Sequence, residues 1–410
     1  MTGTPRSRSR SYRGIARLAV DATAGVTDLV EALHATIAVG TPPLGAPPEG
    51  RTSGIAGLVY RSVRGASRLV GTGLDAALAR LGPLLGETNP APGREALLAA
   101  VNGVLGDYLE ASGNPLAIPM RLRRSGRDLP LHACSLATAV PRPAGRLLLL
   151  VHGLCMSDLG WARGTHDHGA ALERDLGWTS VYLRYNTGRH VSVNGRELSG
   201  LLEAFLPAWP VPVEDLAIVA HSMGGLVTRS ALHYAGEAGH TWPRRLRAIV
   251  FLGTPHHGAP LELGGNLLQA ALGFSPYSLP FARLGKVRSQ GITDLRHGNL
   301  VDEDWSGRDR FARGHDRRRP LPLPEGVACH AVAATTAREV GGLRDRLLGD
   351  GLVPVSSALG DHADPARRLS FPAERTLIVP ATHHFELLDR PEVAARLREW
   401  LAEGGVPGPG

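Results

Sequence analysis

From residue 147 onward, short apolar runs alternate with stretches that have a helical pattern. The runs cover residues 147–151, 180–185, 216–220, 248–252, 329–334 and 376–379, and the helical stretches lie near 169–175, 196–205, 224–235 and 391–401. Near-continuous apolar runs are typical of strands that are buried on both faces of a sheet. Their alternation with helices indicates a mostly parallel sheet flanked by helices, an α/β architecture. We expect this domain to span residues 116–404.

The chain before this domain has a different pattern. Apolar residues recur at spacings of three and four over residues 15–37, and further helical patterns cover about 55–85 and 95–109. Stretches rich in glycine and proline, at 40–50 and 89–93, cannot continue a helix. Residues 1–115 are therefore predicted to form an N-terminal helical extension with a basic, disordered start. Residues 405–410 are expected to be a flexible tail.

One interval inside the α/β domain is too long for a simple connection between two strands. Residues 260–327 have an apolar first half and a second half that mixes arginine with aspartate. Connections in compact α/β domains are usually much shorter. We interpret this interval as a cap inserted over the sheet.

The run at 216–220 ends abruptly at Ser222, and Gly224 and Gly225 open the next helical stretch. This pattern predicts a nucleophile elbow, a tight strand-to-helix turn that holds a serine hydroxyl clear of the sheet. Small residues on both sides of the serine let the helix and the strand approach each other. Ala220 stands where glycine is usual, and its single methyl group is expected to be tolerated.

A serine hydroxyl is a weak nucleophile unless a base accepts its proton. His384 is the best candidate, because it follows the last apolar run, 376–379, at the strand end where catalytic groups of such sheets gather. His383 is adjacent to it, and position alone does not decide between the two.

A carboxylate should orient this base. Asp350 lies in a glycine-flanked loop after the run at 329–334, which gives the chain order serine, aspartate, histidine. The competing carboxylates are Asp345, Asp361 and Asp364, and each of them could equally be a solvated loop charge.

Ester cleavage also needs hydrogen-bond donors for the developing oxyanion. The backbone amide of Met223, directly after the serine, is one candidate. The other is the amide of Leu154, which follows His152 and Gly153 in the loop after the run at 147–151.

The remaining histidine and cysteine patterns do not predict a metal site. His256 and His257 are neighbours, which point in opposite directions on an extended chain, and no carboxylate lies at ligand spacing. We apply the same caution to His166-Asp167-His168 and predict no metal site there. The three cysteines, Cys134, Cys155 and Cys329, include no closely spaced pair, which favours a reducing compartment.

The formal net charge is +7 and comes almost wholly from arginines that are spread along the chain. No nucleic-acid motif accompanies them, so we favour a solvated basic surface over binding to an anionic surface. Charges interrupt any signal-peptide pattern near residues 1–13, and no run of about 18 apolar residues could cross a bilayer. A cytoplasmic protein is expected, whose N-terminal helices pack on the catalytic domain or lie on a lipid surface.

Taken together, these motifs resemble those of the lipase and esterase branch of the α/β-hydrolases, including bacterial proteins similar to inositol deacylases of lipid anchors. The resemblance covers about residues 147–401, and the matching motifs are His152-Gly153-Leu154, the turn at Ser222, residues 252–260, residues 350–353 and residues 384–388. The resemblance implies that His384, rather than His383, is the base. The turn at Ser222 departs from the usual family pattern only at Ala220.

The expected function is hydrolysis of a carboxylic ester through an acyl-Ser222 intermediate, without a cofactor. The predicted cap favours a lipid-like or otherwise apolar acyl substrate. Thioesterase and acyltransferase activity are the nearest alternatives, and an inert binding or scaffold protein of the same fold is a more distant one. Acyl length, leaving group and oligomeric state cannot be read from these motifs.

Overall fold

The computed structural model describes residues 92–259, 289–307, 316–338 and 349–402. The chain divides into two compact units, residues 1–91 with 109–117 and residues 92–108 with 118–410. The first unit is described only at 109–117, which holds the end of helix α3 (Pro92–Ala111) and the turn after it. The predicted helices over 15–37 and 55–85, the apolar half of the predicted cap and the tail at 405–410 lie outside the described residues.

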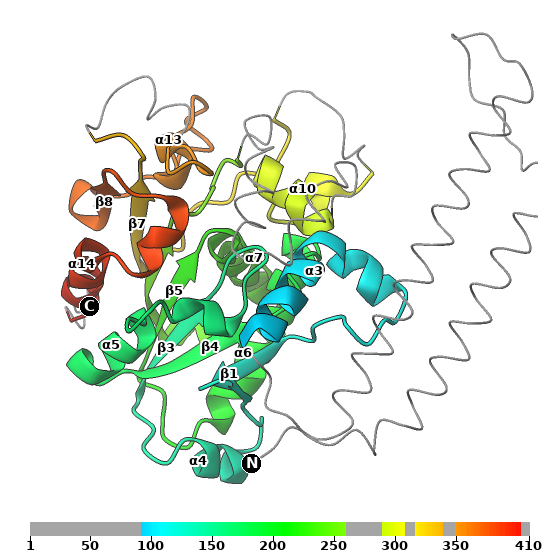
Figure 1. Ribbon diagram of the computed structural model, residues 1–410, viewed down its shortest axis with the longest axis vertical. Helices are drawn as coiled ribbons and strands as arrows, with labels where there is room; N and C mark the ends of the chain where they lie inside the picture. Colours follow the sequence, from blue (N-terminus) through cyan, green and yellow to red (C-terminus); the bar gives the residue numbers. More distant parts are fainter. Residues whose placement is uncertain (1–91, 260–288, 308–315, 339–348, 403–410) are drawn as a thin grey trace, which may run out of the picture. The chain divides into compact units, whose positions relative to one another are not determined.

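Within the described residues, a central sheet of eight strands is the core of the second unit (Figure 1). The strands are β1 (Arg121–Arg124), β2 (Arg127–Asp128), β3 (Arg146–Val151), β4 (Thr179–Arg184), β5 (Asp215–His221), β6 (Leu246–Leu252), β7 (Ala328–Ala334) and β8 (Thr376–Val379). Their order in the sheet is β2-β1-β4-β3-β5-β6-β7-β8. The six strands β3 to β8 pair in parallel with one another, whereas β1 is antiparallel to both β2 and β4.

The six apolar runs all form strands, β3 to β8, whose ends lie within two residues of the predicted ones. The hairpin of β1 and β2 was not predicted. Its strands have a single fully buried side chain, Leu122, among arginines, because β1 lies near the edge of the sheet. Such short edge strands need no apolar run, so the hydrophobic pattern does not reveal them.

The central strands are apolar throughout because the sheet is covered on both faces. Leu149 of β3 packs in a core with residues of α6 (Val191–Ala208) and α7 (Met223–Ala238). Leu150, the next residue, points to the other face and packs with residues of α5 (His168–Leu176) and α14 (Pro391–Ala402). Figure 1 shows these two helix pairs on opposite sides of the strands. The result is a three-layer α/β structure.

The path of the chain through the sheet creates a crevice at its carboxyl edge. The chain leaves β3 for β4 on one side and then crosses to β5 on the other side of β3. Ligands in open parallel sheets bind outside the strand ends at such a switch point. This strand order, together with the turn from β5 directly into α7, is the α/β-hydrolase fold.

The remaining elements are short. They are the helices α4 (Ala133–Ala139), α10 (Gln290–His297), α11 (Asp302–Trp305) and α13 (Val355–Ala358), and the 3-10 turns η2 (Asp158–Trp161), η3 (Trp242–Arg245), η4 (Ala373–Arg375) and η5 (His384–Leu388). Helices α10 and α11 belong to the interval interpreted as a cap. Among the helices of the described ranges, none combines the length and the apolar character that crossing a membrane requires.

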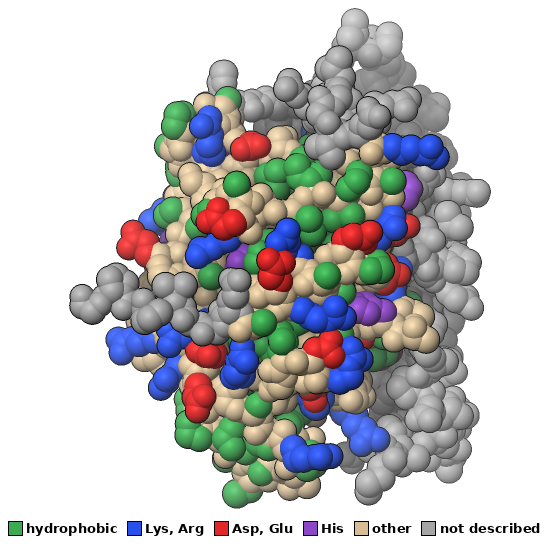
Figure 2. Space-filling model, turned by 90° about the vertical axis from the view of Figure 1, so that its left-hand side faces the viewer, with side chains coloured by type: hydrophobic (Ala, Val, Ile, Leu, Met, Phe, Trp, Pro, Cys, Tyr) green, Lys and Arg blue, Asp and Glu red, His purple; other side chains and the backbone are tan. Residues whose placement is uncertain are grey.

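Basic and acidic side chains are interspersed on the face shown in Figure 2. Charged side chains of the described residues often form ion pairs, as Arg398 does with Asp175 at 2.6 Å. On this face the positive charges do not gather into one patch.

The contact between α7 and the sheet should tolerate no added atom at Gly224. A Cβ atom there would lie 2.4 Å from the backbone oxygen of Val151. We expect Gly224→Ala to lower the free energy of unfolding by about 1–3 kcal/mol through overpacking, measured by urea denaturation. The matched control is Gly236→Ala on the same helix, where a Cβ atom meets nothing within 4 Å. That change should be neutral or stabilising by up to about 1 kcal/mol. Equal effects of the two variants would contradict this description of the contact.

Candidate active site

Ser222 occupies a strained turn between β5 and α7. Its φ of 53° and ψ of −124° lie in a region that side chains other than glycine rarely adopt. The surroundings hold it there: the Ser222 N–H donates to the backbone oxygen of Leu252 at 2.8 Å, and Gly225 N–H donates to the Ser222 oxygen at 3.0 Å. The predicted elbow geometry is therefore present. Strain of this kind persists where the surrounding structure enforces it, often at functional sites.

The loop after β3 lies against this turn. At Gly153, a Cβ atom would be only 2.9 Å from the Cβ atom of Ser222 and 3.1 Å from Nδ1 of His221. Only glycine allows this approach. The next residue, Leu154, is thereby brought beside the serine.

His384 and Asp350 meet in the interior, although 34 residues separate them in the sequence. The Nδ1 atom of His384 lies 2.6 Å from Oδ2 of Asp350, and both residues are only 2% exposed. The other carboxylate oxygen, Oδ1, accepts the N–H groups of Leu352 at 2.9 Å and Val353 at 2.8 Å. The carboxylate is thus held in place by backbone donors while it contacts the imidazole.

The other candidates for the base and for its orienting carboxylate do not take part in this contact. His383 is exposed, and its N–H donates to Oε2 of Glu386 at 2.7 Å. Asp361 and Asp364 are also exposed, and Asp364 pairs with Arg367 at 3.3 Å. Asp345 lies outside the described residues. Of the described candidates, only Asp350 contacts a candidate base.

Ser222 and His384 line the same small cavity, whose volume is about 20 Å³. The other residues around it are mostly apolar: Gly153, Leu154, Met156, His221, Leu295, Leu352, Val353 and Phe385. They come from the loops after β3 and β7, from the last residue of β5, from η5 and from helix α10. The structure therefore gathers the predicted serine and histidine at the carboxyl edge of the sheet, in apolar surroundings.

The two predicted oxyanion donors are available beside Ser222. Leu154 lines the cavity, and Met223 is the first residue of α7. In the described ranges, no acceptor takes a hydrogen bond from either backbone N–H. Buried backbone donors nearly always have a partner, so two free donors next to a strained serine suit a ligand oxygen.

His221 contacts the candidate base and was not singled out from the sequence. Its Nε2–H donates to the backbone oxygen of His384 at 3.2 Å, and the two ring centroids are 4.7 Å apart. Burial lowers the pKa of His221 well below its usual value, and the neighbouring His384 lowers it further. His221 is therefore neutral and links the turn at Ser222 to the backbone of His384.

Two further buried histidines support the loops around the site. His152 stacks on the ring of Tyr185 with centroids 4.5 Å apart, and burial lowers its pKa to about 4. The Nδ1 atom of His168 lies 2.9 Å from Nε2 of His166. On the other side of the ring, the Nε2–H group of His168 donates to the backbone oxygen of Leu387 at 3.0 Å. Burial also lowers the pKa of His168 to about 4. Both imidazoles are neutral at pH 7.

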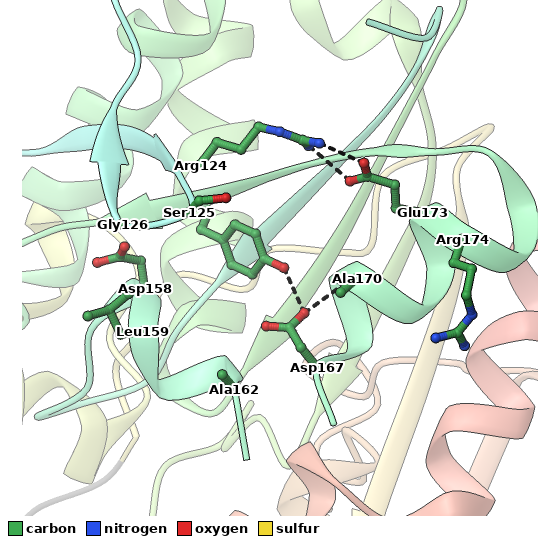
Figure 3. Close-up of a pocket in the computed structure, with 11 residues that line it drawn as sticks. Arg124, Ser125, Gly126, Asp158, Leu159, Ala162, Asp167, Ala170, Glu173 and Arg174 are labelled. Carbon is green, nitrogen blue, oxygen red and sulfur yellow. Dashed lines mark hydrogen bonds and ion pairs between the residues drawn. The ribbon is translucent and has the colours of Figure 1, made fainter. Parts of the chain in front are cut away.

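A much larger pocket, of about 500 Å³, lies away from these residues (Figure 3). It is bounded by the turn between β1 and β2, by η2 and by α5. Its charged groups have partners, and Figure 3 shows the ion pair of Arg124 with Glu173. The Tyr182 hydroxyl donates to Oδ1 of Asp167 at 2.6 Å. None of the predicted site residues lines this pocket.

Comparisons with known proteins give a family model and several distant structures. A domain of unknown function, DUF7379, matches residues 125–267. No curated protein matches the sequence. The mature lipase BlEst2 of Bacillus licheniformis is similar in structure, with 18% identity, coverage of 64% of this chain and 93% of the lipase, and a TM-score of 0.40.

Two other similar structures are also named as lipase or esterase. Lipase B of Aspergillus fumigatus has 12% identity, with coverage of 81% of this chain and 70% of the lipase and a TM-score of 0.38. An esterase of Pyrobaculum calidifontis has 14% identity, with coverage of 64% and 76% and a TM-score of 0.37. At these values, the likeness does not identify a reaction or a substrate for this chain.

The buried neutral histidines should make the protein less stable in acid. The pKa values of His152 and His168 are about 4 in the folded state, below the value of 6.5 for a free imidazole. Between these values the unfolded chain binds protons that the folded chain does not, so stability falls as the pH falls from 6.5 to 4. Each histidine contributes up to about 1.4 kcal/mol per pH unit.

His168→Gln tests this expectation, because glutamine cannot titrate but can still donate to the Leu387 oxygen. Urea denaturation between pH 7 and 4.5 should show a shallower loss of stability for the variant than for the unmodified protein. Equal slopes for the two proteins below pH 6.5 would contradict the neutral state of His168.

Proposed function

We propose that the chain hydrolyses carboxylic esters, with Ser222 as nucleophile, His384 as general base and Asp350 as the residue that orients the base. The proposal rests mainly on one observation. The His384 imidazole contacts the buried Asp350 carboxylate at 2.6 Å and lines the same cavity as Ser222, which lies on a strained turn. Each role that serine-dependent ester cleavage requires has a residue in this one place.

In the first step, the Ser222 oxygen attacks the carbonyl carbon of the ester and its proton passes to His384. The Nδ1 atom of His384 faces Asp350, so Nε2 is the ring nitrogen that is left to accept this proton. The Asp350 carboxylate then stabilises the imidazolium that forms, and it fixes the tautomer beforehand. A carboxylate held by two backbone donors is well placed for this task.

The same step turns the carbonyl oxygen of the ester into an oxyanion. We assign its stabilisation to the backbone N–H groups of Leu154, in the loop after β3, and of Met223, at the start of α7. Donors that are already in place when charge develops lower the barrier without reorganisation. In apolar surroundings this effect is stronger than it would be in water.

The remaining steps return the enzyme to its starting state. The tetrahedral intermediate collapses, its bond to the alcohol oxygen breaks, and His384 returns the proton to the departing alcohol. A water molecule then attacks the acyl-serine ester while His384 accepts a proton from it. The second collapse releases the carboxylic acid, and Ser222 regains its proton from His384.

The lining of the cavity favours an apolar acyl group. Six apolar side chains surround Ser222 and His384, from Leu154, Met156, Leu295, Leu352, Val353 and Phe385. Such a lining offers hydrophobic contacts to an acyl chain and few polar partners to a charged one. The narrower resemblance to inositol deacylases of lipid anchors depends on the motifs alone, and it is the reason to test an acylated phosphoinositide as well as simple esters.

Removal of the nucleophile is the direct test of this function. We expect Ser222→Ala to lower the kcat of ester hydrolysis by about 10⁴ to 10⁶-fold, because no acyl-enzyme can form. The measurement uses p-nitrophenyl esters of graded acyl length and a matching thioester, with the melting temperature as control for folding. A loss of less than tenfold in a folded variant would remove Ser222 from the mechanism.

The orienting carboxylate can be tested with a matched pair of variants. Asp350→Asn keeps the shape of the side chain but cannot stabilise an imidazolium, so we expect kcat to fall by about 10³ to 10⁴-fold. Asp361→Asn is the control, since Asp361 is exposed and follows in the next loop. It should leave kcat within about twofold. Similar losses in both variants would argue against a specific role of Asp350.

A further inference from the structure

The loop that holds Leu154 contains a second strained residue. Met156 N–H donates to the Gly153 oxygen at 3.3 Å, which closes a four-residue turn over Leu154 and Cys155. Cys155, the third residue of this turn, has a φ of 59°. A positive φ at the third position is usually left to glycine or asparagine. Contacts from outside the turn must therefore hold Cys155 in this conformation.

One of these contacts is a hydrogen bond from the backbone of Cys155 to Thr187. The Cys155 N–H donates to Oγ1 of Thr187 at 3.1 Å. Thr187 is 1% exposed and lies in the loop between β4 and α6, 32 residues away in the sequence. It is therefore not part of the turn itself, and it does not line the cavity at Ser222.

The loop of Thr187 is itself held firmly. Its neighbour Asn186 donates from Nδ2 to the backbone oxygen of Gly106 in α3 at 2.9 Å. Asn194 of α6 donates from Nδ2 to the Asn186 oxygen, also at 2.9 Å. Both bonds are buried. The Thr187 hydroxyl is thus held in place, and its hydrogen bond with Cys155 orients the turn.

The opposite side of Cys155 is closed by helix α3. At Gly103, a Cβ atom would lie 2.2 Å from the Cys155 sulfur, so the thiol fills the space that glycine leaves. Burial raises the pKa of this thiol to about 12, so it is protonated at neutral pH. The Cys155 side chain is therefore uncharged, packs on α3 and donates to the Ala100 oxygen at 3.9 Å. On the other side, the backbone N–H of Cys155 is held by Thr187.

We propose that Thr187 is a positioning residue for the oxyanion donor of Leu154. The Cys155 N–H belongs to the peptide that directly follows Leu154, so its bond to Thr187 fixes the orientation of the turn that presents the Leu154 N–H. Thr187 does not touch the substrate and acts through the turn. This inference rests on the proposed function, because an oxyanion donor matters only if an oxyanion forms.

Loss of the contact with Thr187 should raise the free energy of the transition state more than that of the bound substrate. An oxyanion donor must lie about 2.7–3.1 Å from the developing charge, and the loss of one donor costs about 10² to 10³ in kcat. When a donor is displaced but not removed, kcat should fall by less than this. We expect about 10 to 100-fold in kcat with little change in KM when the support from Thr187 is lost.

Thr187→Val and Thr187→Ser form the matched pair. Valine has the shape of threonine without the hydroxyl, whereas serine keeps the hydroxyl. We expect the valine variant to show the loss in kcat, with KM within about twofold, and the serine variant to remain within about threefold of the unmodified protein. The rates are given per active site, with sites counted by titration with a fluorophosphonate. Binding of a trifluoromethyl ketone, which forms an oxyanion on Ser222, should weaken in the valine variant by the same factor as kcat/KM.

The possible outcomes separate the two proposals. If the unmodified protein hydrolyses no ester, the proposed function fails. If it does hydrolyse esters, but the valine variant keeps its kcat per active site within twofold, Thr187 has no positioning role. A lower melting temperature with unchanged kcat per site would likewise assign Thr187 a structural role only. Should the valine variant not fold, Thr187→Ala is measured in the same way and is judged by the same criteria.

Discussion

The contact between the His384 imidazole and the Asp350 carboxylate is the interaction on which the site depends. It joins the loop after β8 to the loop after β7, and the sheet brings the turn at Ser222 to the same edge. An imidazole and a carboxylate that are both 2% exposed are costly to bury singly, but they compensate each other when they are paired. The parallel order of the strands makes this meeting possible, because it places the carboxyl ends of β5, β7 and β8 together.

Tight backbone packing holds these groups in place. Gly224 lets α7 lie against β3, and Gly153 lets the loop after β3 lie against Ser222. Gly253, in the loop after β6, approaches the ring of His384. At Gly253, whose φ is 58°, a Cβ atom would be 3.0 Å from Cε1 of His384. The neutral His221 adds a hydrogen bond to the backbone of His384. The geometry at the site is thus fixed in large part by residues outside the proposed triad.

The hydrophobic pattern predicted the central sheet well and the details of the site less well. Strands β3, β5, β6 and β7 are buried along most of their length, and even the partly buried edge strand β8 is apolar, so each of them appears as an apolar run. The β1–β2 hairpin has one buried leucine and leaves no such run. His383 and His384 could be distinguished only by a family resemblance, because their burial depends on the local turn. The contact of Thr187 with Cys155 spans 32 residues and has no motif, so no periodicity could predict it. The resemblance to lipases and esterases therefore supplied the preference for His384 that spacing alone left open.

The central claim is that Ser222 is activated by His384. The most direct test treats the protein with a fluorophosphonate and locates the adduct by peptide mass spectrometry. The rate at which the adduct forms is then compared in two variants. The account predicts a single adduct on Ser222, formed at least 10³-fold more slowly in His384→Ala and at the unmodified rate in His383→Ala. An adduct on another residue, or equal rates in the two variants, would contradict it.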